Sequence, residues 1–357
     1  MLPHLRYDPR FVADYFPGPD WWPRAPRHIE NAGVLTSGIS NPPVLPIAVR
    51  LVGERQADLG RRHDLWRRCL PGLTAWLRWF LDSRRPPGGQ LPVVVHPWEA
   101  GWDNSPRWDR LSHAGLKPSR PYERLDTRHV AAGERPAGKD YDSYLALAEL
   151  LDGTDYDAAQ YLERTPFAVN DVVVDALWYG AARDVNFMAL LVGQGPAFSD
   201  QELSSYADAF EAVHWSSEKG TYLDWDVAAG SPIAVESAAA VAALAGGVIP
   251  AERAATIWRR FVDQAVGARL VCTVPPSALE FEPARYWRGP VWLNVNWLVI
   301  RGLEHAGMNS EAADLRAQSL ELVADGGFHE YFDAIIGEGR GIAGFTWTAA
   351  VVLDLLG

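Results

Sequence analysis

Two kinds of helical segment alternate along the chain, and this alternation limits the folds that it can adopt. Segments such as DVVVDALWYGAARDVNFMALLVG (171–193) and PVWLNVNWLVIRGL (290–303) are apolar on nearly every side, which is typical of helices buried from several directions. Segments such as SEAADLRAQSLELV (310–323) have one apolar stripe, which is typical of outer helices. We therefore predict inner and outer helices in succession, as in an α/α toroid with its long loops at one mouth.

Helical periodicity and capping signals predict ten helices. A capping-box pattern at Ser199 and Glu202 marks the start of one helix, and Pro71 is expected to kink another. Short apolar fragments such as 93–95 are the only strand candidates. Because no Pro/Gly/Ser-rich linker divides the chain, we expect one all-α domain over residues 1–357. The predicted helices span about 42–57, 65–84, 139–152, 171–193, 199–214, 233–246, 250–265, 291–306, 310–324 and 344–356.

The composition narrows the class of partner. A formal charge of −12, spread without long blocks of one sign, argues against nucleic acid or an anionic membrane surface as partner. The two cysteines, Cys69 and Cys272, lie beside apolar neighbours and are expected to fill the core rather than to form disulfides. Neither a signal peptide nor a run of about 18 apolar residues is visible, so we expect a cytoplasmic protein.

One irregular segment, HPWEAGWDNSPRWD (96–109), gathers three tryptophans, three acids, a histidine and an arginine. Similar segments are YWRGPVWLNVNW (286–297) and FHEYFDAIIGEGRG (328–341), and each adjoins an inner helix. Cleavage of a glycosidic bond needs one protonated carboxyl and one carboxylate, and aromatic rings can pack on sugar C–H groups. Tryptophan clusters are usually core, and loop aspartates usually make turns. The crowding of tryptophans in loops nevertheless indicates a carbohydrate site.

These three segments, together with GISNPPVLPIAVRLV (38–52), resemble the signature segments of glycoside hydrolase family 63. The resemblance is to the bacterial branch of mannosylglycerate and glucosylglycerate hydrolases, and at greater distance to trehalases. It implies an (α/α)6 barrel that cleaves an α-glucoside or α-mannoside, such as glucosylglycerate or mannosylglycerate, with inversion of configuration. It further implies a small carbohydrate as partner, and neither a metal nor a cofactor.

By this resemblance, Asp103 is the general acid and Glu330 is the general base. Burial against Trp102 and Trp108 would raise the pKa of Asp103 and keep its carboxyl protonated, whereas Glu330 should stay ionised and activate water. The resemblance places the substrate-binding residues at Trp98, Glu99, Trp102, Arg107, Tyr286, Trp287, Arg288 and Trp347. At two positions a second interpretation is equally good: Trp347 suits the core, and Asp226 suits either a sugar hydroxyl or a turn.

Ten helices are two fewer than the family's barrel contains, and the chain begins near FVADYFPGPDWWP (11–23), after the first helical pair of the family. We therefore expect a barrel without that pair and with a gap beside the helix at 42–57. Residues 1–37 or a second copy of the chain, in a homo-oligomer, would cover this gap. The residues expected to be unusually exposed there are Val44, Leu45, Ile47, Ala48 and Leu51.

Two other functions remain open at this point. The chain could be a catalytically impaired sugar-binding protein derived from such a hydrolase. It could also be a sugar epimerase on a similar toroid, with histidines as acid and base. The two histidines in aromatic segments, His96 and His329, adjoin the carboxylates already assigned, which disfavours the epimerase.

Overall fold

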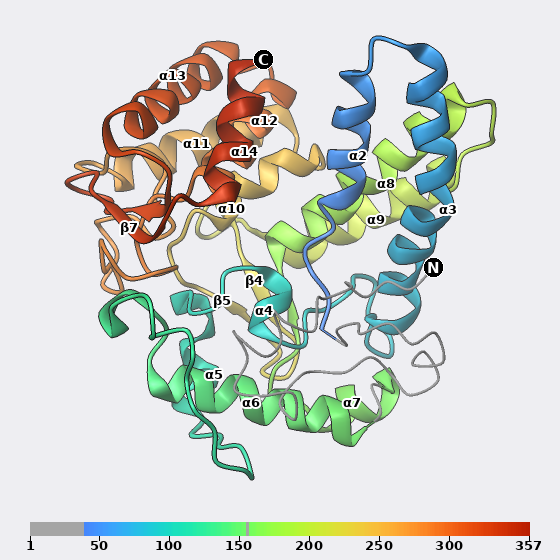
Figure 1. Cartoon of the computed structure of the whole chain (residues 1–357). Coiled ribbons are helices and arrows are strands. Elements are labelled where there is room, and N and C mark those ends of the chain that lie inside the picture. Colours follow the sequence, from blue (N-terminus) through green and yellow to red (C-terminus); the bar gives the residue numbers. More distant parts are fainter. Residues whose placement is uncertain (1–38, 155–156) are drawn as a thin grey trace.

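The computed structural model describes residues 39–154 and 157–357, which form a mostly helical fold (Figure 1). Nine predicted helices are present, and most of their ends fall close to the predicted ones. They are α2 (Leu45–Glu54), α3 (Leu59–Ser83), α6 (Gly138–Gly153), α8 (Val172–Leu191), α9 (Asp200–His214), α11 (Ala251–Gln264), α12 (Leu293–His305), α13 (Asn309–Gly326) and α14 (Thr346–Leu356).

The predicted helix at 233–246 is wrong in its first half. Residues Ser231–Ile233 form strand β5, which pairs with the preceding strand, so the helix cannot begin there. Only the end of the predicted range is helical, as α10 (Ala239–Ala242) followed by the 3₁₀ helix η5 (Ala243–Gly246). Short helices that the sequence analysis does not identify are α4 (Pro97–Ala100), η3 (Pro106–Trp108), α5 (Asp109–His113), η4 (Ala132–Glu134) and α7 (Ala158–Arg164).

In the described part of the chain, three small antiparallel sheets correct the prediction of an all-α chain. The first has the strand order β1-β4-β5, the second pairs β2 with β3, and the third pairs β6 with β7. The strand candidate at 93–95 contributes only a single bridge, between Val94 and Val169. The strands are β1 (Val169–Asn170), β2 (Trp215–Ser216), β3 (Thr221–Tyr222), β4 (Asp224–Asp226), β5, β6 (His329–Phe332) and β7 (Gly339–Ala343).

Local signals in the sequence explain several helix ends. The capping box at the start of α9 is confirmed, because Ser199 and Glu202 exchange side-chain and backbone hydrogen bonds. Asp171 caps α8, and its side chain accepts from the N–H groups of Val173 and Val174. Pro71 lies inside α3, which continues through it.

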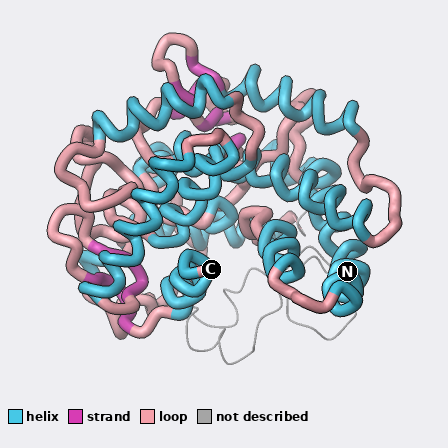
Figure 2. Tube along the Cα trace, turned by 90° about the horizontal axis from the view of Figure 1, so that it is seen from above, coloured by secondary structure: helices cyan, strands magenta, loops and turns pink. Residues whose placement is uncertain are grey.

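The 3₁₀ helix η5 packs against both α8 and α12, with α2 and α3 against α8 and with α13 and α14 against α12. Figure 2 shows that helices make up most of the described chain and that the strands are short. Gly302 of α12 allows the close approach to η5, because a Cβ there would lie 2.3 Å from the side chain of Leu244. The apolar α8 and α12 are mostly buried, as predicted for inner helices.

Cys272 is buried and Cys69 partly buried, and both are free thiols.

The predicted exposure of apolar residues along α2 is largely confirmed. Val44, Leu45 and Ala48 are exposed and Leu51 is partly so, but Ile47 is buried against the core. A similar stripe on α14 contains Leu353, which is 71% exposed. An ion pair of 2.6 Å between Arg55 and Asp354 connects the ends of these two helices. The expectation that residues 1–37 cover this face lies outside the described residues.

No helix in the described part of the chain combines the length and the apolar character that a membrane span needs.

Candidate active site

The backbone of Asp103 lies in a tight loop between α4 and η3. His96 caps α4, and the chain leaves this helix at Gly101 in a left-handed conformation, with a φ of 73°. The hydroxyl of Tyr144 on α6 donates to the carbonyl of Asp103 over 2.7 Å. These contacts restrict where the Asp103 carboxyl can lie.

Burial raises the pKa of Asp103 to about 7 from an ordinary value of 3.8, as the sequence predicts. The positive charge of Arg135 opposes this rise, whereas the negative charge of Glu330 adds to it. Because charges in a partly solvated protein interact strongly only over short distances, these three groups belong to one site. A carboxyl with a pKa of about 7 is half protonated near neutral pH, as a general acid requires.

Glu330 lies on β6 with only 7% of its surface exposed. Arg135 donates to both of its oxygens, with Nη1–Oε1 and Nη2–Oε2 distances of 2.8 Å each. The N–H of Ile342 on β7 donates to Oε2 over 3.1 Å. The neighbouring Gly341 has a φ of 67°, and a Cβ there would lie 2.3 Å from Oε2, so this turn of the chain around the carboxylate requires glycine.

The sequence analysis does not identify Arg135. It follows η4 in a stretch of glycine and proline without aromatic neighbours, and its partner Glu330 is 195 positions away. Further hydrogen bonds connect the loop that carries Arg135 to the β6–β7 hairpin. The hydroxyl of Tyr331 donates to the carbonyl of Glu134 over 2.8 Å, and the N–H of Gly341 donates to the Glu134 carboxylate over 3.0 Å. No local sequence signal could have revealed this arrangement.

Tyr286 lies close to both carboxyls. Burial raises its pKa well above the ordinary value, and the negative charges of Asp103 and Glu330 add to the rise. The guanidinium of Arg135 lies over its ring, 4.9 Å from the centroid. Within the described residues, Tyr286 is the one residue other than glycine with a positive φ, at 44°. Strained backbone of this kind is concentrated at functional sites.

Three predicted tryptophans differ in how much surface they present. Trp98 is partly exposed and packs against His96 and Tyr144, with centroid distances of 4.5 and 5.6 Å. Trp102 and Trp287 are almost completely buried and stack on each other, with centroids 5.6 Å apart and planes 12° apart. Of these three rings, Trp98 has the most surface that a sugar could contact.

Groups of the protein itself occupy three of the roughly four acceptor positions of the Glu99 carboxylate. Oε1 accepts from Arg84 Nη2 and from the N–H of Ser40, each over 2.9 Å, and Oε2 accepts from the N–H of Val95 over 2.8 Å. Glu99 is only 2% exposed. This geometry favours a role in holding the loop of Asp103 over direct contact with a sugar.

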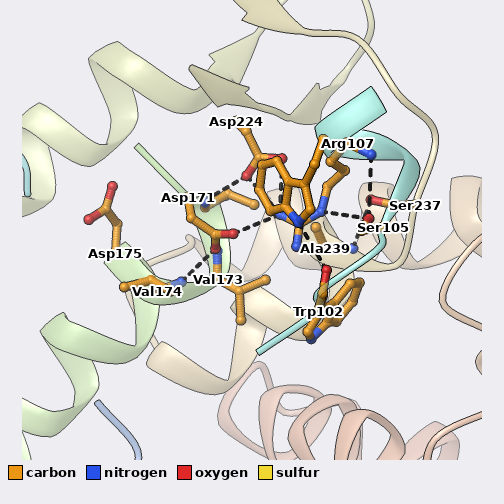
Figure 3. Close-up of polar contacts among 12 residues, drawn as sticks. Trp102, Ser105, Arg107, Asp171, Val173, Val174, Asp175, Asp224, Ser237 and Ala239 are labelled. Atoms are coloured by element: carbon orange, nitrogen blue, oxygen red, sulfur yellow. Dashed lines mark hydrogen bonds and ion pairs between the residues drawn. The ribbon is translucent and has the colours of Figure 1, made fainter. Parts of the chain in front are cut away.

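Arg107 lies in a buried ionic cluster beneath the same loop (Figure 3). Its Nη1 donates to Asp171 over 2.9 Å and to Asp224 over 3.0 Å, and its Nε donates to Ser105 over 3.3 Å. The guanidinium also covers the ring of Trp108, 4.4 Å from the centroid. An arginine so enclosed supports the loop, and its side chain has almost no surface left for a ligand.

A second polar group joins Asp175 on α8, labelled in Figure 3, to two residues of α9, Tyr206 and His214. Asp175 accepts from Tyr206 over 3.2 Å and lies 3.0 Å from Nε2 of His214. Burial raises the pKa of Asp175 to about 6, against the opposing hydrogen bond to His214. The signal in the sequence is DVVVD (171–175), where two acids flank three valines at the start of the helix.

Arg288 is engaged in two ion pairs, with Asp109 over 2.6 Å and with Glu282 over 2.8 Å. It therefore connects the Asp103 segment to the segment that follows Tyr286.

The interpretation of Trp347 as a core residue is wrong, because 56% of its surface is exposed.

Asp226 pairs with Arg110 and accepts from the N–H of Ala229 over 2.9 Å, which is a turn contact. Among residues 39–154 and 157–357, no three or more His, Cys, Asp or Glu side chains are grouped so that they could hold a metal ion.

Comparison with known proteins supports the resemblance seen in the sequence. The domain family described as mannosylglycerate hydrolase MGH1-like glycoside hydrolase matches residues 1–348. The mannosylglycerate hydrolase of Thermus thermophilus is 41% identical over 355 residues, which are 99% of this chain and 84% of that protein. The glucosylglycerate hydrolase of Mycolicibacterium hassiacum is 33% identical over 382 residues, covering 100% of this chain and 83% of that protein.

A solved structure is similar over nearly the whole chain. The crystal structure of GH63 mannosylglycerate hydrolase from Thermus thermophilus in complex with Tris and D-glycerate has a TM-score of 0.89. It is 39% identical, and the match covers 97% of this chain and 82% of that one. This chain therefore belongs to the mannosylglycerate hydrolase MGH1-like family of glycoside hydrolases and is an enzyme of that class.

Proposed function

We propose that this enzyme hydrolyses the α-glycosidic bond of mannosylglycerate or glucosylglycerate with inversion of configuration, with Asp103 as general acid and Glu330 as general base. The observation that carries the proposal is the pair of carboxyls at one site. Burial keeps one of them largely protonated up to about pH 7, and the other is a carboxylate in an ion pair with Arg135.

The two carboxyls would act on opposite faces of the sugar ring. Asp103 donates its proton to the glycosidic oxygen while the bond from that oxygen to the anomeric carbon breaks. Glu330 accepts a proton from a water molecule, whose oxygen forms the new bond to the anomeric carbon from the other side. The products are glycerate and the free sugar with the opposite anomeric configuration. Asp103 ends ionised and Glu330 protonated, so one proton must return before the next cycle.

The aglycone in such substrates carries a carboxylate, which needs a cation beside the acid. Arg135 is suited to this, because it is the cation whose charge acts most strongly on Asp103. Two related enzymes are named for glycerate conjugates, and the related crystal structure contains D-glycerate. We propose that the guanidinium of Arg135 shares its five donors between Glu330 and the carboxylate of the substrate.

The remaining predicted residues would divide into two groups. We propose that Trp98 and Tyr286 contact the sugar or aglycone, and that the exposed Trp347 borders the entrance. The residues proposed to hold the loops in place are Glu99, Trp102, Arg107, Trp287 and Arg288. The chain would form one catalytic domain of (α/α)6 type.

A time course of hydrolysis followed by proton NMR tests the proposal. We expect cleavage of α-mannosylglycerate or α-glucosylglycerate, with the β-anomer of the free sugar appearing first. Appearance of the α-anomer first would mean retention and would contradict the roles given to the two carboxyls. Binding without cleavage, measured by thermal shift, would favour the sugar-binding protein. Conversion to an epimer without cleavage would favour the epimerase. Trehalose, which lacks the carboxylate, is the control for the role of glycerate.

A further inference from the structure

Four aromatic rings form a continuous stack, which we call the aromatic column: Trp102, Trp287, Trp292 and Tyr331. The rings of Trp102 and Trp287 lie 5.6 Å apart at 12°, and those of Trp287 and Trp292 lie 3.8 Å apart at 7°. The rings of Trp292 and Tyr331 lie 5.0 Å apart at 22°. The column therefore extends unbroken from the loop after α4 to strand β6.

The two ends of the aromatic column adjoin the two catalytic carboxyls. Trp102 directly precedes Asp103 in the sequence, and Tyr331 directly follows Glu330. Neither end ring is more than 4% exposed, so both are enclosed by other protein atoms. Because protein interiors are close-packed, a change in the thickness of the column must displace at least one of its ends. The column thus connects the position of the acid to the position of the base.

Hydrogen bonds from backbone N–H groups join the same parts of the chain beside the rings. The N–H of Trp287 donates to Oδ1 of Asn104, the residue after the acid, over 3.0 Å. Val291 and Phe332 exchange two backbone hydrogen bonds of 2.9 Å each. The segment 286–292 is therefore attached to the acid segment at one end and to β6 at the other.

Trp292 has a second contact that bears on the site. Its indole N–H donates to the carbonyl of Tyr286 over 2.9 Å, and Tyr286 is the residue with the positive φ of 44°. The ring of Tyr286 also meets Trp292 edge-on, with centroids 5.4 Å apart. Trp292 itself is only 2% exposed, so it acts on the site through its neighbours.

We infer that Trp292 is a positioning residue, which sets the separation of Asp103 and Glu330 through the aromatic column. The inference rests on the proposed function, because an inverting hydrolase needs roughly 6.5–9.5 Å between its two carboxyls to admit a water molecule. A misplacement of about 1 Å at such a site can reduce the rate roughly 100-fold.

Two substitutions of Trp292 and one matched control test the inference. Trp292→Phe keeps a ring in the column but removes the N–H, and Trp292→Leu removes the ring. The control is Trp66→Phe, since Trp66 is equally buried and its indole N–H also donates to a backbone carbonyl, that of Val49, over 3.2 Å. Trp66 lies on α3, away from the column.

We expect Trp292→Leu to lower kcat roughly 100-fold with little change in KM, and Trp292→Phe to lower it less. The basic limb of the pH profile of kcat should also move, because the charge of Glu330 contributes to the pKa of Asp103. Trp66→Phe should lower the unfolding temperature but leave kcat and the pH profile as in the wild type. If the Trp292 variants lose stability as the control does while kcat and the pH profile stay unchanged, the inference is wrong.

A titration separates this inference from the proposed function. The pKa of a ¹³C-labelled Asp103 carboxyl can be followed by NMR whether or not the enzyme turns over. A shift in Trp292→Leu, absent in Trp66→Phe, supports the inference even if no glycerate glycoside is cleaved. In that case only the proposed function fails. An unshifted titration in both variants overturns the inference, whatever the wild type hydrolyses.

Discussion

Arg135 and Glu330 are 195 positions apart in the sequence and form a bidentate ion pair, with both N–O distances at 2.8 Å. Both side chains are less than a tenth exposed. Each of the two partners therefore compensates a charge that would be costly to bury alone. The Glu330 carboxylate retains about one acceptor position for a water molecule, because the guanidinium and the Ile342 N–H occupy three of about four.

Arg135→Ala should lower the free energy of unfolding by about 3–5 kcal/mol at neutral pH, because it leaves the Glu330 carboxylate buried without its partner. Chemical denaturation measures this loss. Adding Glu330→Gln should recover a large part of it, since the second change removes the uncompensated charge. If the loss in the double variant equals the sum of the losses in Arg135→Ala and Glu330→Gln measured singly, the pair is not coupled and the interpretation is wrong.

Asp103→Asn should lower kcat by about 10²–10⁴-fold while leaving the fold intact, because the amide has nearly the same shape but is not an acid. Steady-state kinetics on the glycerate glycosides give the loss, and circular dichroism checks the fold. Asp152→Asn, on the exposed side of α6, is the control and should retain full activity. A variant at Asp103 that keeps more than about a tenth of the activity would exclude this residue as the general acid.

Activity should fall as the pH rises through about 7, because burial raises the pKa of Asp103 to about that value and the general acid must be protonated. A pH profile of kcat/KM reports this group in the free enzyme. The fall should be absent for an activated substrate whose leaving group needs no proton. Full activity on the glycerate glycosides well above this pH would contradict the assignment.

The same raised pKa has a consequence for stability. The pKa of Asp103 is higher in the folded protein than its ordinary value of 3.8, so the folded state binds the proton more tightly than the unfolded state does. The stability from this group is complete below its ordinary pKa and is lost as the pH rises toward about 7. Asp103→Asn removes the effect. Thermal unfolding should therefore show a gain for the variant that is larger at about pH 8 than at about pH 4. An equal difference at both values would show that the pKa is not raised.

Arg107→Met should lower the free energy of unfolding by about 3–5 kcal/mol, because Asp171 and Asp224 then lose their buried cation. The control is Arg110→Met, since the side chain of Arg110 is 60% exposed and its ion pair should contribute less than about 1 kcal/mol. The free energy of unfolding is measured for both variants by chemical denaturation, and KM is measured for both by steady-state kinetics. A large rise in KM with unchanged stability would instead show that Arg107 binds the sugar.

The helices could be predicted because their information is local. Apolar residues recur at helical spacing in α8 and α12, and the capping box at Ser199 marks the start of α9 within the sequence itself. The failure at 233–246 has the opposite cause. Residues 231–233 are paired with β4, so the helix cannot begin at 233, and helical structure starts only at Ala239.

The candidate acid and base could be found from their neighbours in the sequence, because both stand in segments rich in aromatic residues. The roles of Glu99 and Arg107 could not be predicted in this way, since a polar residue in such a segment can point toward a ligand or toward the protein. The structure shows that both side chains bind protein groups.

The sequence by itself determined that the chain is mostly helical, that aromatic residues gather in three irregular segments, and that two carboxyls stand among them. It also determined the family, because these motifs occur together and in order over the whole chain. Only the tertiary structure decided that Arg135 meets Glu330 and that four rings connect Asp103 to Glu330. The physical reason is that these contacts join segments far apart in the chain, and their distances depend on how the helices pack rather than on any local pattern.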